Sequence, residues 1–137
     1  GETRDMNIEA FATAWAPRLL SVLRIVSGLL FLQHGTAKYL KIPALPAFAK
    51  VDPTSLSGVA GMFELAGGVL LILGLFTRCA AFVLSGLMAF AYFLAHAPRG
   101  FFPIANAGEL AVLYCFVFLY IAAAGPGPWS LDAARRK

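Results

Sequence analysis

Four long apolar stretches, separated by short polar links, limit how this chain can fold more than any other feature of its sequence. They cover residues 18–38, 56–76, 79–97 and 104–124. Each has about the 20 residues that an α-helix needs to cross the hydrocarbon core of a bilayer. Because backbone polar groups in lipid must be satisfied within the segment, such stretches are expected to be helical. The sequence therefore predicts an all-α membrane protein with four transmembrane helices.

The links between the stretches predict an up-down-up-down antiparallel bundle. Only Thr77 and Arg78 separate the second stretch from the third, and residues 98–103 join the third to the fourth. The longest link, residues 39–55, contains three prolines and is expected to be an interfacial loop. The sequence Gly-Pro-Gly-Pro at 125–128 is expected to end the fourth helix, because proline cannot continue a helix and glycine suits a left-handed cap.

Composition and charge support this prediction. Of the 137 residues, 60% are apolar or aromatic and 13% are charged, whereas soluble domains average roughly 45–50% and about 25%. So few charges cannot cover the surface of a small soluble monomer. The net charge of +4 comes from basic residues between the apolar stretches and at the C-terminus, which is the arrangement that orients membrane proteins. We therefore expect the lipid bilayer, and not nucleic acid, to be a partner of this chain.

The flanks of the apolar stretches predict the orientation and the domain boundaries. Basic residues are slightly more frequent on the side of the termini, with five (Arg18, Arg78, Arg135, Arg136 and Lys137) against four on the other side (Lys38, Lys41, Lys50 and Arg99). This excess favours both termini in the cytoplasm. Residues 1–5 precede the first methionine, and we interpret them as an expression remnant. Residues 6–131 then form the transmembrane domain, and residues 132–137 form a basic cytoplasmic tail.

Eight polar residues in or next to the apolar stretches are candidates for a functional pocket. They are Arg24, His34 and Lys38 in the first stretch, Glu64 in the second, Tyr92 and His96 in the third, and Asn106 and Glu109 in the fourth. A charge at the centre of a spanning helix costs roughly 2.5–3.5 kcal/mol, so each one requires a reason. The antiparallel order brings most of these residues to the half of the bilayer away from the termini. We expect His34, Glu64 and Glu109 to surround a common cavity, and Arg24 to pair with Glu64.

Structural interpretations of the same residues stay open alongside the functional one. Lys38 lies at a helix end, where its ammonium group could snorkel to the interface, and His96 could be an interfacial histidine without a ligand. No helix carries the residue spacing of a metal site, so neither a metal nor haem is expected. Cys79 and Cys115 are expected to lie about 13 Å apart along the bundle axis, which is too far for a disulfide.

Several segments of the chain resemble one known family. The segment from Arg24 to Lys38, RIVSGLLFLQHGTAK, is similar to the first-helix signature of the DoxX family of small four-helix bacterial membrane proteins. ELAGG at 64–68 and LGLFTR at 73–78 resemble its second helix and following turn, and His96 with FFP at 101–103 and NAGEL at 106–110 resemble its third loop and fourth helix. The resemblance covers residues 18–131 and implies a multi-pass protein of the bacterial inner membrane.

The resemblance also implies a redox function, because family relatives include membrane subunits of thiosulfate:quinone oxidoreductases and proteins linked to thiol redox balance. We therefore expect a quinone-interacting subunit in which His34, Lys38 and His96 donate hydrogen bonds and Glu64 and Glu109 carry protons. Tyr92, Phe31 or Phe93 is expected to line the ring site. The sequence has no haem-attachment motif, Fe–S cysteines or dinucleotide-binding glycines, so a redox partner protein is expected. The alternative is a non-enzymatic membrane scaffold or small-molecule carrier whose polar cluster is structural. Assembly into a homo-oligomer is compatible with either interpretation.

Overall fold

All regular structure in residues 2–136, whose backbone this computed structural model describes, is helical. Side chains are described from residue 7 to residue 136. The helices are α1 (Glu2–Tyr39), η1 (Pro46–Phe48), α2 (Leu56–Leu73), α3 (Thr77–Ala91), η2 (Tyr92–His96), η3 (Ala97–Arg99), α4 (Pro103–Asn106), α5 (Glu109–Ala124) and α6 (Leu131–Arg135). The prediction of an all-helical chain is therefore confirmed.

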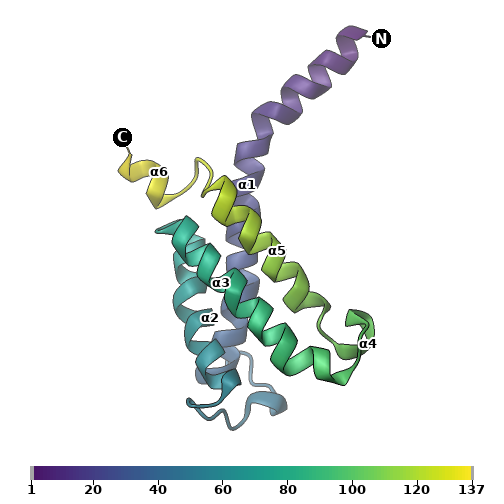
Figure 1. The fold of residues 1–137 in the computed structure, drawn as a ribbon. Coiled ribbons are helices and arrows are strands. Elements are labelled where there is room, and N and C mark those ends of the chain that lie inside the picture. Colours follow the sequence, from purple (N-terminus) through teal and green to yellow (C-terminus); the bar gives the residue numbers. More distant parts are fainter. Residues whose placement is uncertain (1, 137) are drawn as a thin grey trace.

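Three helical segments are long and apolar enough to cross a membrane. They lie at Asn7–Tyr39, Leu56–Leu73 and Thr77–Arg99, the last of which joins α3 to the short helices η2 and η3. Helix α5 is also apolar but has 16 residues, a length of about 24 Å. The arrangement in Figure 1 pairs α1 with α2 and α3 with α5, and a short turn connects α2 to α3.

Helix α1 is longer than the sequence predicts. The sequence places its start at residue 18, where the first apolar stretch begins after Pro17. In the structure the helix has 38 residues and includes Pro17 in its interior, which gives it a length of about 57 Å. Its N-terminal half extends beyond the other helices in Figure 1, and residues 7–19 are exposed.

Small residues let α1 and α2 approach each other closely. A Cβ atom on Gly35 would lie 2.9 Å from the backbone nitrogen of Leu65 and 3.0 Å from the carbonyl oxygen of Gly61. A Cβ atom on Gly68 would lie 3.0 Å from the Cα atom of Leu32. Without a hydrophobic effect between helices in lipid, such backbone contact supplies the packing energy. The glycines near Glu64 therefore serve the packing of α1 against α2.

The core lies between the helices, while large apolar side chains also cover their outer faces. Phe31 packs edge-on against Tyr114 and Phe118, with ring centroids 5.5 Å and 5.1 Å away. On the outside, Phe82 is 65% and Phe116 is 63% exposed. Water would disfavour such surfaces, whereas lipid solvates them.

The third and fourth predicted helices differ in detail from the structure. The predicted helix at 104–124 is broken, because Ala107 adopts a left-handed conformation (φ 62°) and the side chain of Asn106 accepts a hydrogen bond from the Gly108 nitrogen. This turn separates α4 from α5. The third helix continues past residue 91 as the π-helical turn η2, and α2 ends at Leu73 because Gly74 forms a left-handed cap (φ 67°).

Candidate functional site

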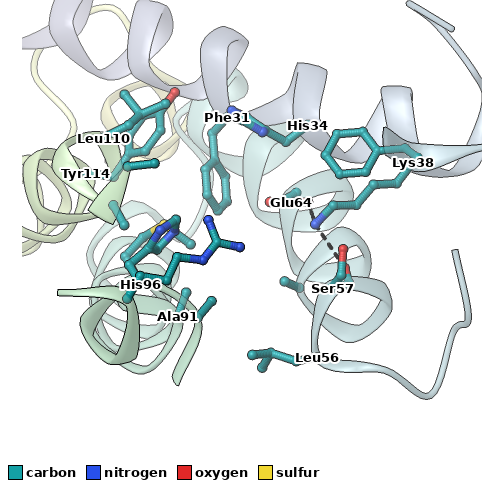
Figure 2. Close-up of a pocket in the computed structure, with 17 residues that line it drawn as sticks. Phe31, His34, Lys38, Leu56, Ser57, Glu64, Ala91, His96, Leu110 and Tyr114 are labelled. Carbon is teal, nitrogen blue, oxygen red and sulfur yellow. Dashed lines mark hydrogen bonds and ion pairs between the residues drawn. The ribbon is translucent and has the colours of Figure 1, made fainter. Parts of the chain in front are cut away.

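A cavity of about 460 Å³ opens among the helices at the end of the fold away from the termini. Its wall combines the last part of α1, the first part of α2, the end of the α3–η3 segment and the first part of α5, with Phe48 of η1 beside them. The polar or titratable side chains that line it are His34, Lys38, Ser57, Glu64, His96, Arg99 and Tyr114. Figure 2 shows His96 and Lys38 on opposite sides of this space.

Lys38 and Glu64 form an ion pair inside the cavity. Lys38 Nζ lies 2.9 Å from Glu64 Oε1, and each side chain is only 7% exposed. The same ammonium group donates to the Ser57 carbonyl oxygen at 2.9 Å and lies 5.5 Å from the centre of the Phe48 ring. The interpretation of Lys38 as a snorkelling residue is therefore wrong, since its charge is turned inward and compensated.

Glu64 keeps unused hydrogen-bonding capacity. Its Oε1 atom is buried and accepts no well-aligned hydrogen bond from the described residues, although the Lys38 ammonium group is near. An ionised carboxylate has about four acceptor positions. A hydroxyl or N–H group that entered the cavity would therefore find a buried acceptor at Glu64.

Arg24 does not pair with Glu64, so this prediction is wrong. The guanidinium group points toward the other end of the bundle, where Nε donates to the Leu71 carbonyl oxygen and one terminal nitrogen donates to that of Trp129, each at 2.7 Å. The other terminal nitrogen donates to the carbonyl oxygen of Pro126. Leu71 belongs to the last turn of α2, where its carbonyl oxygen has no i+4 donor within the helix and also accepts from the nitrogen of the capping Gly74 at 3.2 Å. These carbonyls attract Arg24 away from the cavity.

The contacts of Arg24 belong to a clasp, defined by Ser21, Arg24 and Asp132, that fixes residues 126–132 to the bundle. Ser21 Oγ accepts from the Trp129 nitrogen at 3.1 Å and donates to the Pro126 carbonyl oxygen at 3.2 Å. The Asp132 carboxylate accepts from the backbone nitrogens of Phe76 and Thr77, both at 2.9 Å. It thereby caps the start of α3, which has no capping side chain of its own.

The hydrogen bonds of the clasp also act on the ionisation of Asp132. Burial alone would raise the pKa of this carboxyl group. The hydrogen bonds from Thr77 and Phe76, together with the charge of Arg135, outweigh burial and hold the pKa below its ordinary value. The clasp therefore stabilises the ionised form of Asp132.

Two histidines line the cavity from different helices. The His34 ring stands edge-on to Tyr114, with centroids 6.5 Å apart. His96 Nδ1 lies 3.0 Å from the carbonyl oxygen of Asn106. Because a carbonyl oxygen can only accept, Nδ1 carries a proton, and Nε2 is the ring atom left for a ligand.

Tyr92 and Asn106 support His96 and do not line the cavity themselves. Asn106 is fully buried, and its side-chain nitrogen donates to the Tyr92 hydroxyl at 3.1 Å and to the Gly100 carbonyl oxygen at 2.9 Å. The Tyr92 ring stacks on His96, with centroids 6.3 Å apart. Both residues were predicted as pocket residues, and the structure gives them positions behind the wall.

Glu109 lies outside the cavity, so the predicted common cavity of His34, Glu64 and Glu109 is wrong for its third member. Glu109 is exposed and is the first residue of α5. The break at residues 107–108 restarts the helix at this point, so the phase of a continuous helix does not apply. An acidic residue in the first turn is favoured by the helix dipole, which gives Glu109 a structural role.

Arg99 is a cavity residue that the sequence did not single out. It was counted only as a charge of the link between the third and fourth stretches, yet it lines the cavity. The π turn at Tyr92–His96 and the 3₁₀ turn at Ala97–Arg99 extend α3 far enough to bring it there. A pattern search has no signal for a π turn, which often marks a functional site.

The other candidate groups carry less chemistry. Within residues 7–136, no cluster of three or more histidine, cysteine, aspartate or glutamate side chains could hold a metal ion. The thiols of Cys79 and Cys115 are free, the first exposed and the second half-buried. Ser85 Oγ donates to the Cys115 carbonyl oxygen at 2.7 Å, which ties α3 to α5.

The fold and the cavity define a small helical membrane protein whose buried carboxylate and ammonium groups meet in a single pocket. The sequence profile of the DoxX family matches residues 19–97. The chain belongs to the DoxX family.

Two relatives extend this finding over most of the chain. An uncharacterized protein of Haemophilus influenzae is 52% identical over 124 residues, which cover 86% of this chain and 91% of the relative. An uncharacterized membrane protein of Mycobacterium tuberculosis is 30% identical over 152 residues and covers 88% of each chain. No solved structure matches.

Proposed function

We propose that this protein is a quinone-binding membrane subunit of a redox system, and that the cavity around Lys38 and Glu64 is its quinone site. The single observation that carries the proposal is a buried, charged pair facing an apolar cavity. The volume of about 460 Å³ falls within the roughly 300–1,000 Å³ of small-molecule sites. Aromatic and aliphatic side chains form most of the remaining wall, among them Phe31, Met88 and Leu110.

The residues of the wall fit the needs of a quinone ring. Quinones supply two-electron redox chemistry and require hydrogen-bond donors at their carbonyl oxygens. The Lys38 ammonium group is a donor on one side of the cavity. On the opposite side, Nε2 of a neutral His96, whose proton lies on Nδ1, is an acceptor for a hydroxyl group of the reduced ring. The buried Oε1 of Glu64, which lacks a well-aligned hydrogen bond, fits the hydroxyl group of a reduced ring. Phe31 and Tyr114 offer ring faces to either form.

The membrane arrangement that follows has four spans. We place α1, α2, the α3–η3 segment and α5 across the bilayer in up-down-up-down order, with the cavity opening toward the side away from the termini. The short length of α5 is compensated by the apolar residues of α4 and the link before it. We place the protein in the bacterial inner membrane with both termini in the cytoplasm, in agreement with the positive-inside rule.

A redox partner is part of this proposal. The chain's own residues bind, orient and exchange protons, and they offer no electron-carrying group of their own. A partner protein that docks on the membrane surface would therefore supply or accept the electrons.

The second candidate function is a scaffold or small-molecule carrier without redox activity. The observation in its favour is that Lys38 already has internal partners, since the Ser57 carbonyl oxygen and Glu64 both bind its ammonium group. A purely structural pair would explain these contacts.

Extraction of the purified protein separates the two functions. Solvent extraction and mass spectrometry should find a quinone at near-stoichiometric amounts in the native protein. The amount should fall strongly in Glu64→Gln and stay unchanged in the matched Glu109→Gln, whose exposed carboxyl group lies outside the cavity. A stable protein that neither retains nor rebinds a quinone would favour the scaffold or carrier.

A further inference from the structure

We infer that the cavity prefers a ligand that binds as an anion, so that its best occupant is a quinone or hydroquinone ring with one ionised hydroxyl group. The inference rests on the proposed function and specifies the class of ring. It derives from the surplus of positive charge around the cavity. A site for an uncharged ring would not need such a surplus.

The cavity wall carries a surplus of positive charge. The charged residues that line it are one lysine (Lys38), one arginine (Arg99) and one glutamate (Glu64). The charges of Lys38 and Glu64 compensate each other, since Nζ and Oε1 lie 2.9 Å apart. The positive charge of Arg99 is therefore left without compensation. The remaining titratable side chains of the wall, His34, His96 and Tyr114, include no carboxyl group that could offset Arg99.

Neither of the nearby carboxylates outside the cavity supplies the missing charge. Glu109 is exposed and does not line the cavity. Asp52 is bound by Thr54, whose backbone nitrogen and hydroxyl donate to it at 2.9 Å and 2.8 Å. Within residues 7–136, neither forms an ion pair with Arg99.

Arg99 differs from Arg24 and Arg78, two other arginines near helix ends, in being free to bind. Arg24 donates to three carbonyl groups, and Arg78 donates to those of Ala122 and Ala123. Within the part of the chain that the structure describes, the guanidinium group of Arg99 has no hydrogen bond and no ion pair. An oxyanion on the ligand would be its partner, and the apolar walls would weaken the screening of that contact.

Two quinones of nearly equal size separate the effect of charge from that of shape. At neutral pH 2-methyl-1,4-naphthoquinone is uncharged, whereas 2-hydroxy-1,4-naphthoquinone is an anion. Dissociation constants for both should be measured on the purified full chain in a non-ionic detergent. We expect the hydroxylated ring to bind about tenfold more tightly, as expected for one unit charge about 5 Å from an oxyanion in a partly screened site.

Variants of the charged wall should change the affinity ratio in opposite directions. Arg99→Gln should bring the two affinities close to equality, whereas the matched Arg136→Gln, in the exposed C-terminal tail, should leave the ratio unchanged. Glu64→Gln removes the negative charge, so although it should weaken the binding of both rings, the ratio of affinities should shift further toward the anion. Because Arg99 is exposed at the edge of the cavity, Arg99→Gln tests the inference even if Glu64→Gln fails to fold.

The outcomes distinguish this inference from the proposed function. Equal affinities of the native protein for the two rings would overturn the anion preference and leave the quinone site standing. A preference for the anion that survives Arg99→Gln would overturn the role of Arg99. Failure of both rings to bind would overturn the proposed function itself.

Discussion

Buried cations in this chain are compensated in two different ways, and the difference separates structure from function. Arg24, which has no exposed surface, donates only to backbone carbonyl groups, those of Leu71, Pro126 and Trp129. Lys38 instead forms an ion pair with a carboxylate on the wall of a cavity. A cation that satisfies helix ends stabilises the fold, whereas a buried ion pair on a cavity wall is costly to desolvate and can exchange partners. We therefore assign Arg24 to the clasp and Lys38 to the site.

The ion pair predicts a specific pattern of stability changes. Removing one partner of a buried pair typically costs about 3–5 kcal/mol, so Lys38→Ala and Glu64→Ala should each lower the unfolding free energy in detergent by about that amount. The double variant should lose clearly less than the sum of the single variants. For Arg24→Ala combined with Glu64→Ala we expect additive losses, because their side chains have separate partners. Coupling between Arg24 and Glu64 would contradict the geometry described here.

Asp132 predicts that the clasp opens in acid. Because the pKa of Asp132 in the folded chain lies below its ordinary value of 3.8, its contribution is complete above about pH 4 and is lost as the pH falls further, through the folded pKa. Trp129 lies within residues 126–132, which the clasp holds, so its fluorescence should change over this pH range. Asp132→Asn should remove that change, and an unaltered acid transition in the variant would assign it to another group.

At the scale of elements, α1 and α2 depend on glycine for their close contact. A Cβ atom on Gly35 would meet Leu65 Cγ at 2.8 Å and the Leu65 nitrogen at 2.9 Å. Since a backbone atom cannot move aside as a side chain can, the helices would have to separate. Gly35 and Lys38 lie on the same turn of α1, so this separation would also disturb the cavity.

A pair of glycine variants tests this contact. Gly35→Ala should destabilise the protein by about 1–3 kcal/mol through overpacking. In Gly86→Ala the new Cβ atom has no atom within 4 Å, so the better helix propensity should stabilise α3 by up to about 1 kcal/mol. Thermal unfolding in detergent would measure both. Equal effects of the two substitutions would mean that α1 and α2 are not packed backbone to backbone.

The short elements near the cavity are the part of the site that could not be predicted from the sequence. Helical phase correctly brought His34, Lys38, Glu64 and His96 to one end of the fold. Helical phase could not predict the π turn at Tyr92–His96 or the left-handed conformation of Ala107, because both depend on hydrogen bonds formed only in the folded chain. These two features bring Arg99 into the cavity and turn Glu109 outward.

At the scale of the whole molecule, the apolar stretches were sufficient to predict the helices. Their lengths anticipated the all-helical fold and most helix boundaries. The clasp was not anticipated, since its contacts join Ser21 and Arg24 to residues more than 100 positions away. Pairing by depth alone favoured Glu64 as the partner of Arg24, because the backbone carbonyl groups that bind Arg24 leave no mark in the sequence.

The proposed orientation predicts which thiols are accessible from outside the cell. Cys79 is exposed near the start of α3, at the end of the fold where the termini lie. In spheroplasts, a membrane-impermeant maleimide should leave Cys79 unlabelled. It should label a cysteine that replaces Phe101, which is 86% exposed at the opposite end. The reverse pattern would invert the proposed topology.

Photolabelling with an azidoquinone tests the quinone site most directly. Irradiated membranes should yield adducts on peptides that contain the cavity wall, at residues 31–38, 57–64, 88–99 and 107–114. Unlabelled 2-methyl-1,4-naphthoquinone should compete with the label, and Glu64→Gln should lose the adducts. Labelling spread over the outward-facing Phe82 and Phe116, without competition, would contradict a quinone site in the cavity.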